Sequence, residues 1–238
     1  MANDEKIKTQ TFGATERHSH WYLGIVALFI TTLITANIIS VKLVYIVGLV
    51  LPAGILVFPL SYIIGDVLTE VYGYSSARRV IWLGFLCNFI AVIAILSAQG
   101  LPPAPFWDGQ QAYEKILGYA PRLLAASFTA YLAGEFFNAY ILARMKILTK
   151  GRWLWSRTIG STLVGQGVDS MIFISLAFIG TMPFGTLVMA IVVQWLAKSA
   201  YEAAATPLTY MAVIFLKRKE KMDVYDHNTR FNPFRIRT

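Results

Sequence analysis

Residues Phe58–Trp82 read FPLSYIIGDVLTEVYGYSSARRVIW, and this stretch determines how the rest of the chain is interpreted. An apolar run leads directly into two carboxylates, Asp66 and Glu70, and ends on a pair of arginines, Arg78 and Arg79. A charged side chain near the centre of a membrane-spanning helix costs about 2.5 to 3.5 kcal/mol. Acids in so apolar a segment therefore require a partner, which is either another helix or a bound solute.

The composition predicts an all-α integral membrane protein. Hydrophobic residues make up 56% of the 238 residues and charged residues 14%, whereas soluble proteins carry about 25% charged residues. A membrane helix needs roughly 20 apolar residues. We expect a tail over 1–19 without a removable signal peptide, a six-helix membrane domain over 20–216, and a basic tail over 217–238. The predicted helices are approximately 20–41, 53–73, 76–98, 119–144, 157–180 and 184–216.

The positive charges predict the orientation. Cytoplasmic loops of membrane proteins are rich in Lys and Arg. Seventeen of the 21 such residues fall in the two tails and the even-numbered loops, against three in the odd-numbered loops and Lys198 within the last helix. Six helices with both termini in the cytoplasm are therefore expected. The net charge of +8 follows this distribution, so no direct nucleic-acid partner is predicted.

Two apolar segments do not fit simple spans. Residues 41–51 are too few to cross the membrane, so a re-entrant or interfacial piece is expected there. The last block of about 33 residues is too long for one perpendicular crossing, so either Pro207 kinks it or the helix tilts and projects into the cytoplasm.

The loop before the fourth helix and the small residues after it suggest surface and packing roles. The loop is rich in Pro and aromatic residues, which is typical of a lid or short surface helix, although a plain connector has the same composition. In the fourth and fifth helices small residues recur every four positions, which predicts close helix packing. These residues are Ala126, Ala130, Gly134, Ser161 and Gly165.

The sequence lacks the residues that metal sites, catalytic triads and ATP-hydrolysing proteins require. Cys87 is the only cysteine, and the three histidines lie in the tails, so neither a metal site nor a catalytic triad is predicted inside the membrane domain. The sequence has no Walker A loop for ATP hydrolysis, no HExxH motif and no nucleophile elbow. We therefore expect no enzyme activity and no cofactor.

Buried polar residues form stripes along the predicted helices. Their spacings of three and four place each set on one helix face. Four polar stripes cannot all face lipid, so we predict that they converge on one cavity. The predicted substrate-binding residues are Asp66, Glu70, Glu135, Asn138, Gln166, Asp169, Gln194, Lys198 and Glu202.

Three of these predictions have structural alternatives. Glu70 lies near a helix end, where it could pair with Arg78 or Arg79 instead of a ligand. Lys198 and Glu202 are four residues apart and could neutralise each other. Asp169 has no cation nearby in the sequence, which favours a role in ligand binding or coupling.

The balance of charge limits the ligand. Five acids against one lysine suit a cation, a proton-coupled step or a neutral ligand rich in N–H donors. A carboxylate accepts two parallel N–H bonds, and a guanine-like ring presents such a donor pair. From the residues alone, the prediction is a carrier for a small polar solute.

Motifs along most of the chain resemble the queuosine precursor transporter family, also called the vitamin uptake transporter family. They are Phe58-Pro59, the run from Gly65 to Gly73, Ala77-Arg78-Arg79, RLLAASFTAYLAGEFFNAYI, RTIGSTLVGQGVDSMIF and the terminal TRFNPF. The resemblance covers roughly Thr35 to Phe234. Some relatives read Gly-Gln-x-x-Asp where this chain has Gly134-Glu135-Phe136-Phe137-Asn138, so the acid and the amide exchange places.

The resemblance implies a bacterial inner-membrane importer of 7-cyano-7-deazaguanine or 7-aminomethyl-7-deazaguanine for tRNA queuosine modification. It also implies a fold similar to the substrate-binding subunits of energy-coupling-factor transporters, and polar family positions at Asp66, Gln166, Asp169 and Lys198. The alternative is a subunit that binds a vitamin or another nucleobase and works with a separate ATPase. A homo-oligomer and an energy-coupling subunit are both open as partners.

The resemblance also suggests a binding mode for the deazaguanine. We expect the base to stack on an aromatic side chain, with Asp169 or Glu135 accepting its N1–H and amine. Gln166, Asn138 or Lys198 would donate to its carbonyl, and Asp66 and Glu70 would line the cytoplasmic half of the cavity.

Overall fold

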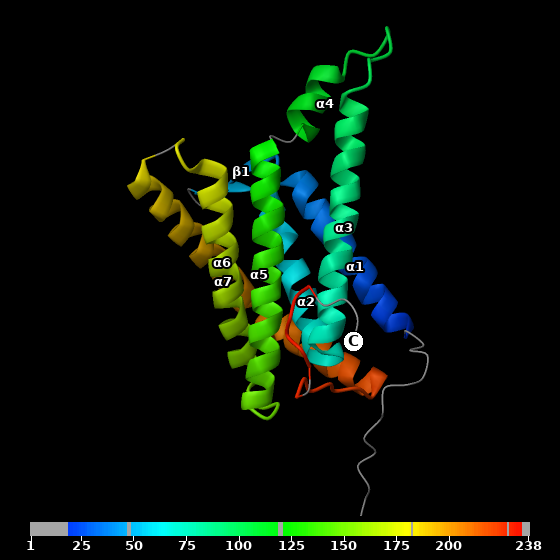
Figure 1. Ribbon diagram of the computed structural model, residues 1–238, viewed down its shortest axis with the longest axis vertical. Helices are drawn as coiled ribbons and strands as arrows, with labels where there is room; N and C mark the ends of the chain where they lie inside the picture. Colours follow the sequence, from blue (N-terminus) through cyan, green and yellow to red (C-terminus); the bar gives the residue numbers. More distant parts are fainter. Residues whose placement is uncertain (1–18, 47–48, 119–120, 182, 228, 235–238) are drawn as a thin grey trace, which may run out of the picture.

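The computed structural model of the protein describes all residues except 1–18, 47–48, 119–120, 182, 228 and 235–238. Helices dominate it, and the long ones run side by side as a bundle (Figure 1). The helices are α1 (His20–Ile39), α2 (Phe58–Tyr72), α3 (Tyr74–Gln99), α4 (Gln110–Leu117), α5 (Pro121–Leu148), α6 (Leu154–Phe178) and α7 (Phe184–Glu220). The six long helices match the six predicted ranges, with ends that differ by a few residues.

Four of these helices, α1, α3, α6 and α7, are long and apolar enough to cross a membrane. Between 11% and 44% of each apolar window is buried, so most of that surface faces outward, as contact with lipid requires. Helix α2 has only 15 residues, and α5 interrupts its apolar residues with charged ones. Six crossings therefore remain a prediction, while the all-α membrane class is confirmed.

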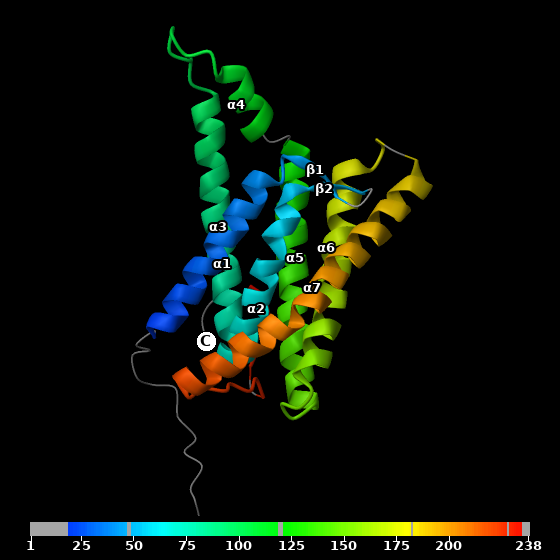
Figure 2. The same ribbon diagram turned by 180° about the vertical axis from the view of Figure 1, so that it is seen from behind.

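The segment after α1 is a β-hairpin and not a helix. Strands β1 (Leu43–Ile46) and β2 (Leu49–Pro52) pair antiparallel, and a short 3-10 helix, Ala53–Leu56, leads into α2. Two paired strands satisfy each other's backbone groups, which allows a segment too short to span to form regular structure. Figure 2 shows the hairpin near the end of the bundle where α6 and α7 meet.

Helix α2 is the central element, with thirteen of its 15 residues buried. It packs against α1, α3, α5 and α7. It ends at Gly73, whose φ of +80° is a backbone conformation that favours glycine, and α3 begins immediately afterwards. The acids of the Phe58–Trp82 stretch thus lie on the most buried helix of the bundle.

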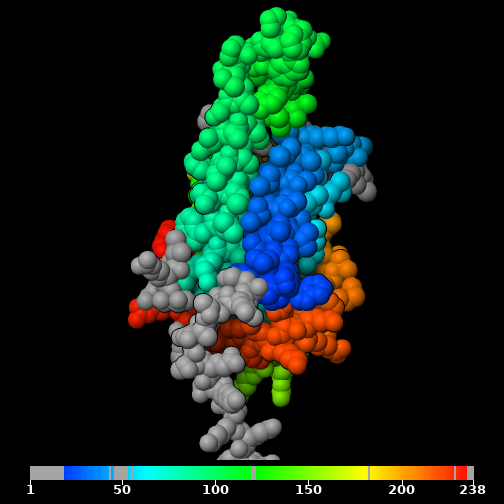
Figure 3. Space-filling view, turned by 90° about the vertical axis from the view of Figure 1, so that its right-hand side faces the viewer, coloured from blue at the N-terminus to red at the C-terminus, as the bar shows by residue number. Residues whose placement is uncertain are grey.

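The outer helices enclose α2. Figure 3 shows α1 and α3 side by side on one face, with the end of α7 crossing below them. There Trp21 of α1 meets Phe215 of α7 edge to face, with ring centroids 5.1 Å apart. Helix α7 is one 37-residue helix, about 55 Å long, with Pro207 inside it. It runs obliquely across the bundle (Figure 2), and whether it tilts in the membrane or bends at Pro207 stays a prediction.

The surface helix predicted in the long loop is α4, which packs against the end of α3. Tyr113 of α4 donates a hydrogen bond to the Ile95 carbonyl at 3.2 Å. None of the α4 residues is buried.

Candidate functional site

The crossing of α5 and α6 places the site residues. A Cβ added at Gly165 would lie 2.7 Å from the Asn138 Cβ and 3.0 Å from the Gly134 carbonyl oxygen. A Cβ added at Gly134 would lie 2.9 Å from the Asp169 Cβ. Only glycines allow the two backbones to approach so closely, and the predicted small-residue packing is confirmed. From this crossing Asn138 of α5 reaches α2, whereas Gln166 and Asp169 of α6 bond to α7.

The polar face of α2 consists of Tyr62, Asp66 and Glu70, four residues apart and each no more than 2% exposed. Asn138 of α5 donates a hydrogen bond to Asp66 at 2.8 Å. The structure therefore joins two predicted site residues from different helices.

Glu202 of α7 meets α6. It accepts hydrogen bonds from Thr162 at 2.8 Å and from Gln166 Nε2 at 3.1 Å. Because an ionised carboxylate can only accept, the amides of Gln166 and Asn138 must turn their NH₂ groups toward Glu202 and Asp66. Their carbonyl oxygens are consequently directed elsewhere.

Four buried polar atoms at this level have no hydrogen-bond partner among the residues that the structure describes. They are Tyr62 Oη, Glu135 Oε1, Asn138 Oδ1 and Gln166 Oε1. Asn138 Oδ1 and Gln166 Oε1 are amide oxygens, which can only accept. Glu135 Oε1 also only accepts when its carboxyl group is ionised. A buried acceptor without a donor is unfavourable by about 1–3 kcal/mol. The Tyr62 hydroxyl can itself donate, so the three acceptor oxygens are the atoms for which a ligand or water could supply donors.

Glu135 lies at the centre of this level. Its Oε2 would be 3.2 Å from a Cβ added at Gly65 of α2, and it interacts electrostatically with Asp66, Asp169 and Glu202. Of the acid and amide pair on α5, Asn138 is already bound to Asp66, whereas Glu135 Oε1 is unpaired. Asn138 keeps an unpaired Oδ1 as well, so both residues of this helix present an acceptor without a donor in the parts of the chain that the structure describes.

Asp169 and Lys198 form an ion pair 2.5 Å long between α6 and α7. The sequence left open a pair between Lys198 and Glu202, but the ion pair of Lys198 is with Asp169. Asp169 thus has its cation on α7 and not among its neighbours in the sequence. Lys198 Nζ also lies 4.6 Å from the ring centroid of Phe58, and Phe58 packs on Tyr62 at 5.1 Å. A cation and two aromatic rings thus border the unpaired acceptors.

Glu70 occupies a separate group, here called the Glu70 cluster, which comprises Glu70, Lys146, Arg157, Lys217 and Asp223. Glu70 Oε1 accepts from Arg157 at 2.8 Å and from Lys217 at 2.7 Å. The structure thus pairs Glu70 with cations of α5, α6 and α7. The sequence suggested Arg78 or Arg79 as the partner of Glu70. Arg78 donates instead to the carbonyls of Arg230 and Asn232 in the C-terminal tail.

Gln194 is half-buried on α7, one turn before Lys198. No hydrogen bond joins it to the other predicted residues in the described part of the chain. The structure thus brings seven predicted residues to one level, places Glu70 in its own cluster, and leaves Gln194 at the margin.

The site also contains residues that the sequence reasoning did not select. Tyr62 and Phe58 could have been found from their spacing of four with Asp66. Lys146 and Arg157 were interpreted as loop charges, although each is only 1% exposed. Helix α5 extends to Leu148, so Lys146 is a helix residue that points into the bundle.

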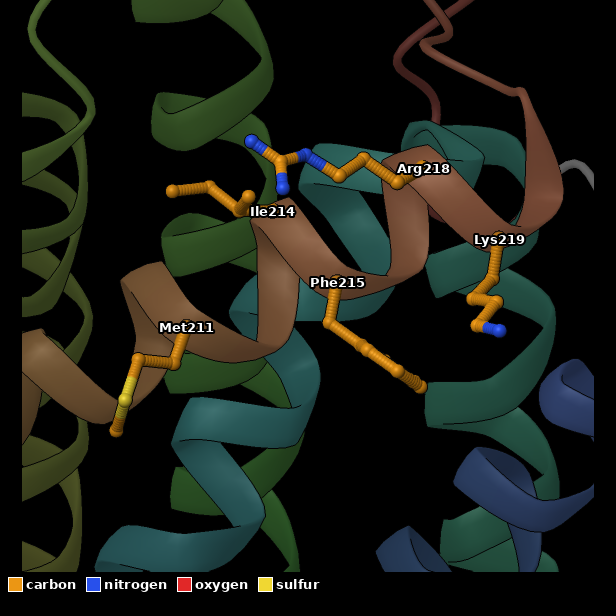
Figure 4. Close-up of a pocket in the computed structure, with 5 residues that line it drawn as sticks. All are labelled: Met211, Ile214, Phe215, Arg218 and Lys219. Carbon is orange, nitrogen blue, oxygen red and sulfur yellow. The ribbon is translucent and has the colours of Figure 1, made fainter.

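An open groove of about 360 Å³ lies away from this site, on the outer face of α7. Its lining residues are Met211, Ile214, Phe215, Arg218 and Lys219 (Figure 4). None of the predicted site residues borders it. Apolar side chains beside two cations at a helix end are typical of a surface that faces lipid and headgroups.

Comparison with known proteins gives one consistent result. Residues 52–212 match the family described as "Putative vitamin uptake transporter". The chain is 30% identical to a "Probable queuosine precursor transporter" of Bacillus subtilis, over 79% of this chain and 82% of that protein. It is 28% identical to the "Queuosine precursor transporter" of Escherichia coli, over 70% of this chain and 72% of that protein. No solved structure matches.

Proposed function

Because this multi-pass membrane protein belongs to the vitamin uptake transporter family, we propose that it imports a queuosine precursor of the 7-deazaguanine class. Its relatives are named as transporters and not as enzymes. The observation that carries the choice of ligand is the group of unpaired acceptors between α2, α5 and α6. A guanine-like base brings the N–H donors that these oxygens lack.

Glu135 is the proposed acceptor for the base edge. Its free Oε1 and its adjacent Oε2 present the two-oxygen geometry that binds N1–H and the exocyclic amine in parallel. Lys198 donates to the carbonyl of the base, and Phe58 with Tyr62 forms the aromatic surface beside it. The carbonyl oxygens of Asn138 and Gln166 are available for the remaining ring N–H.

Uptake is tested in bacteria that lack queuosine precursor synthesis and their own importer. Cells expressing this protein receive nanomolar 7-cyano-7-deazaguanine or its aminomethyl relative, and queuosine in tRNA is measured. We expect restored queuosine. Membrane-inserted protein that restores none with either compound would refute the substrate assignment.

The acceptor role is tested with Glu135→Gln. This change replaces one acceptor oxygen by a donor, so precursor affinity should fall by about 10- to 100-fold, as expected for hydrogen bonds to a charged group. Glu114→Gln, on the exposed helix α4, is the matched control and should transport normally.

The donor requirement is tested by competition. An analogue that lacks the exocyclic amine leaves a buried acceptor unpaired, so it should compete at least about tenfold more weakly than the parent base. Equal competition would show that the amine is not recognised. Uptake only in cells that also supply an energy-coupling ATPase would favour the alternative of a binding subunit.

A further inference from the structure

The Glu70 cluster lies one level beyond the proposed ligand site along α2. Tyr62, Asp66 and Glu70 share one face of the helix at intervals of four residues, which is about 6 Å per step. The end that carries the cluster also carries most of the Lys and Arg residues, so the positive-inside rule assigns it to the cytoplasm. A solute that leaves the Asp66 level along this face of α2 toward the cytoplasm meets Glu70.

Glu70 ties four helices together at this level. Arg157 of α6 and Lys217 of α7 both bind its Oε1, and Lys146 of α5 donates to its backbone carbonyl at 2.5 Å. The side chains of Glu70, Arg157 and Lys146 are at most 2% exposed. Separation of these helices leaves buried charges unpaired, which is strongly unfavourable. The cluster therefore holds this end of the bundle closed.

Residues 223–227 and 229–234 form a C-terminal strap across the same end (Figure 1). Lys146 donates to Asp223 at 2.6 Å and to the Val224 carbonyl at 2.7 Å. Asp226 accepts from the first backbone N–H of α3, on Tyr74, at 3.0 Å. Farther along the strap, Trp82 of α3 donates to the Pro233 carbonyl at 2.8 Å. The strap thus bonds to α3 and α5 on either side of α2.

The rim of the cluster is accessible, although its centre is not. The Asp223 side chain is 41% exposed and that of Lys217 is 23% exposed, whereas that of Glu70 is fully buried. A closure with polar bonds at its edge can open by exchanging those bonds for water, without unfolding a helix.

We propose that the Glu70 cluster and the C-terminal strap are the cytoplasmic gate of this transporter, and that Glu70 is a gate residue and not a ligand of the solute. The gate opens when Glu70 separates from Arg157 and Lys217 and the strap lifts from the end of α2. The direction of release rests on the proposed transport function, but the closure itself does not.

The test measures access from the cytoplasmic side. Cys87 is the only cysteine, so Cys87→Ala provides a cysteine-free background. Thr158→Cys serves as the reporter, because Thr158 is 3% exposed, follows Arg157 and shares a helix face with Thr162. Its labelling by a membrane-impermeant maleimide is timed in inverted vesicles, which expose the cytoplasmic face.

The gate is weakened by Lys217→Gln, with Lys219→Gln as the matched control. Both changes remove one lysine from the end of α7, but Lys219 lies in the outer groove. Lys217→Gln should label on the order of tenfold faster than the parent, whereas Lys219→Gln should label at the parent rate. Glu70→Gln should have a still larger effect, and Lys217→Gln decides the question if Glu70→Gln does not fold.

Two results would overturn the gate. One is equal labelling of Lys217→Gln and Lys219→Gln, and the other is a parent reporter that labels as fast as denatured protein. Labelling requires no solute, so a failed uptake assay with an intact labelling difference would reject the substrate and keep the gate.

Discussion

The substitution Gly165→Ala should destabilise the protein and damage its site together. The added Cβ would lie 2.7 Å from the Asn138 Cβ, whereas ordinary van der Waals contact begins at 3.4 Å, so α5 and α6 must separate by about 0.7 Å. Overpacking of this kind costs about 1–3 kcal/mol, which is roughly a 5- to 150-fold loss in the folding equilibrium. A shift of that size in either direction takes the 2.8 Å bond from Asn138 to Asp66 outside the 2.7–3.2 Å range of good N–H···O bonds.

Unfolding in mixed detergent micelles with increasing SDS, followed by tryptophan fluorescence, measures the stability change, and tRNA queuosine measures transport. Gly24→Ala is the matched control, because a Cβ there meets nothing within 4 Å and alanine favours the helix. We expect this control to unfold no earlier than the parent. If Gly165→Ala unfolds at the same SDS fraction as Gly24→Ala, the close crossing does not position the site.

Three further outcomes are expected. Burial acts to raise the pKa of Asp223, but hydrogen bonds from two lysines outweigh it and hold the pKa below its usual value. The charged form therefore stabilises the fold above about pH 4 and loses this effect as the pH falls through the folded-state pKa, so the stability difference between Asp223→Asn and the parent should shrink between pH 7 and pH 3. A constant difference would contradict this. The exchange Glu135→Gln with Asn138→Asp puts two carboxylates at the Asp66 level in direct contact, so precursor uptake should fall at least as far as in Glu135→Gln alone; normal uptake would show that the two positions are equivalent. Lys198→Met leaves a largely buried carboxylate without its cation and should reduce stability in SDS titrations by about 3–5 kcal/mol, whereas Lys115→Met on exposed α4 should change it little.

The helices could be predicted from the sequence because each is a long apolar block that ends at a recognisable interruption. Residues 184–216 and 20–41 are examples, and the structure places helices within a few residues of both. The hairpin at Leu43–Pro52 could not be predicted in this way. A short apolar run has the same composition whether it forms a strand, a re-entrant segment or part of a buried helix.

The site was predicted at the level of residue type and helix face, but not at the level of pairing. Asn138 with Asp66 and Asp169 with Lys198 are joined across 72 and 29 residues, and sequence spacing does not determine which stripes meet. Glu70 shows the consequence most clearly. The arginines nearest to it in the sequence are Arg78 and Arg79, but the cations that bind it are Lys146 of α5, Arg157 of α6 and Lys217 of α7.

The C-terminal strap has a consequence for biosynthesis. Asp226 and the Pro233 carbonyl are translated after α7, yet they accept from the first N–H of α3 and from the indole of Trp82. Until those residues leave the ribosome, the inserted bundle carries open donors and an incompletely paired Lys146 at its cytoplasmic end. The strap contacts can therefore form only after α7 has been synthesised, and a ribosome stalled before residue 223 would hold a bundle that lacks them.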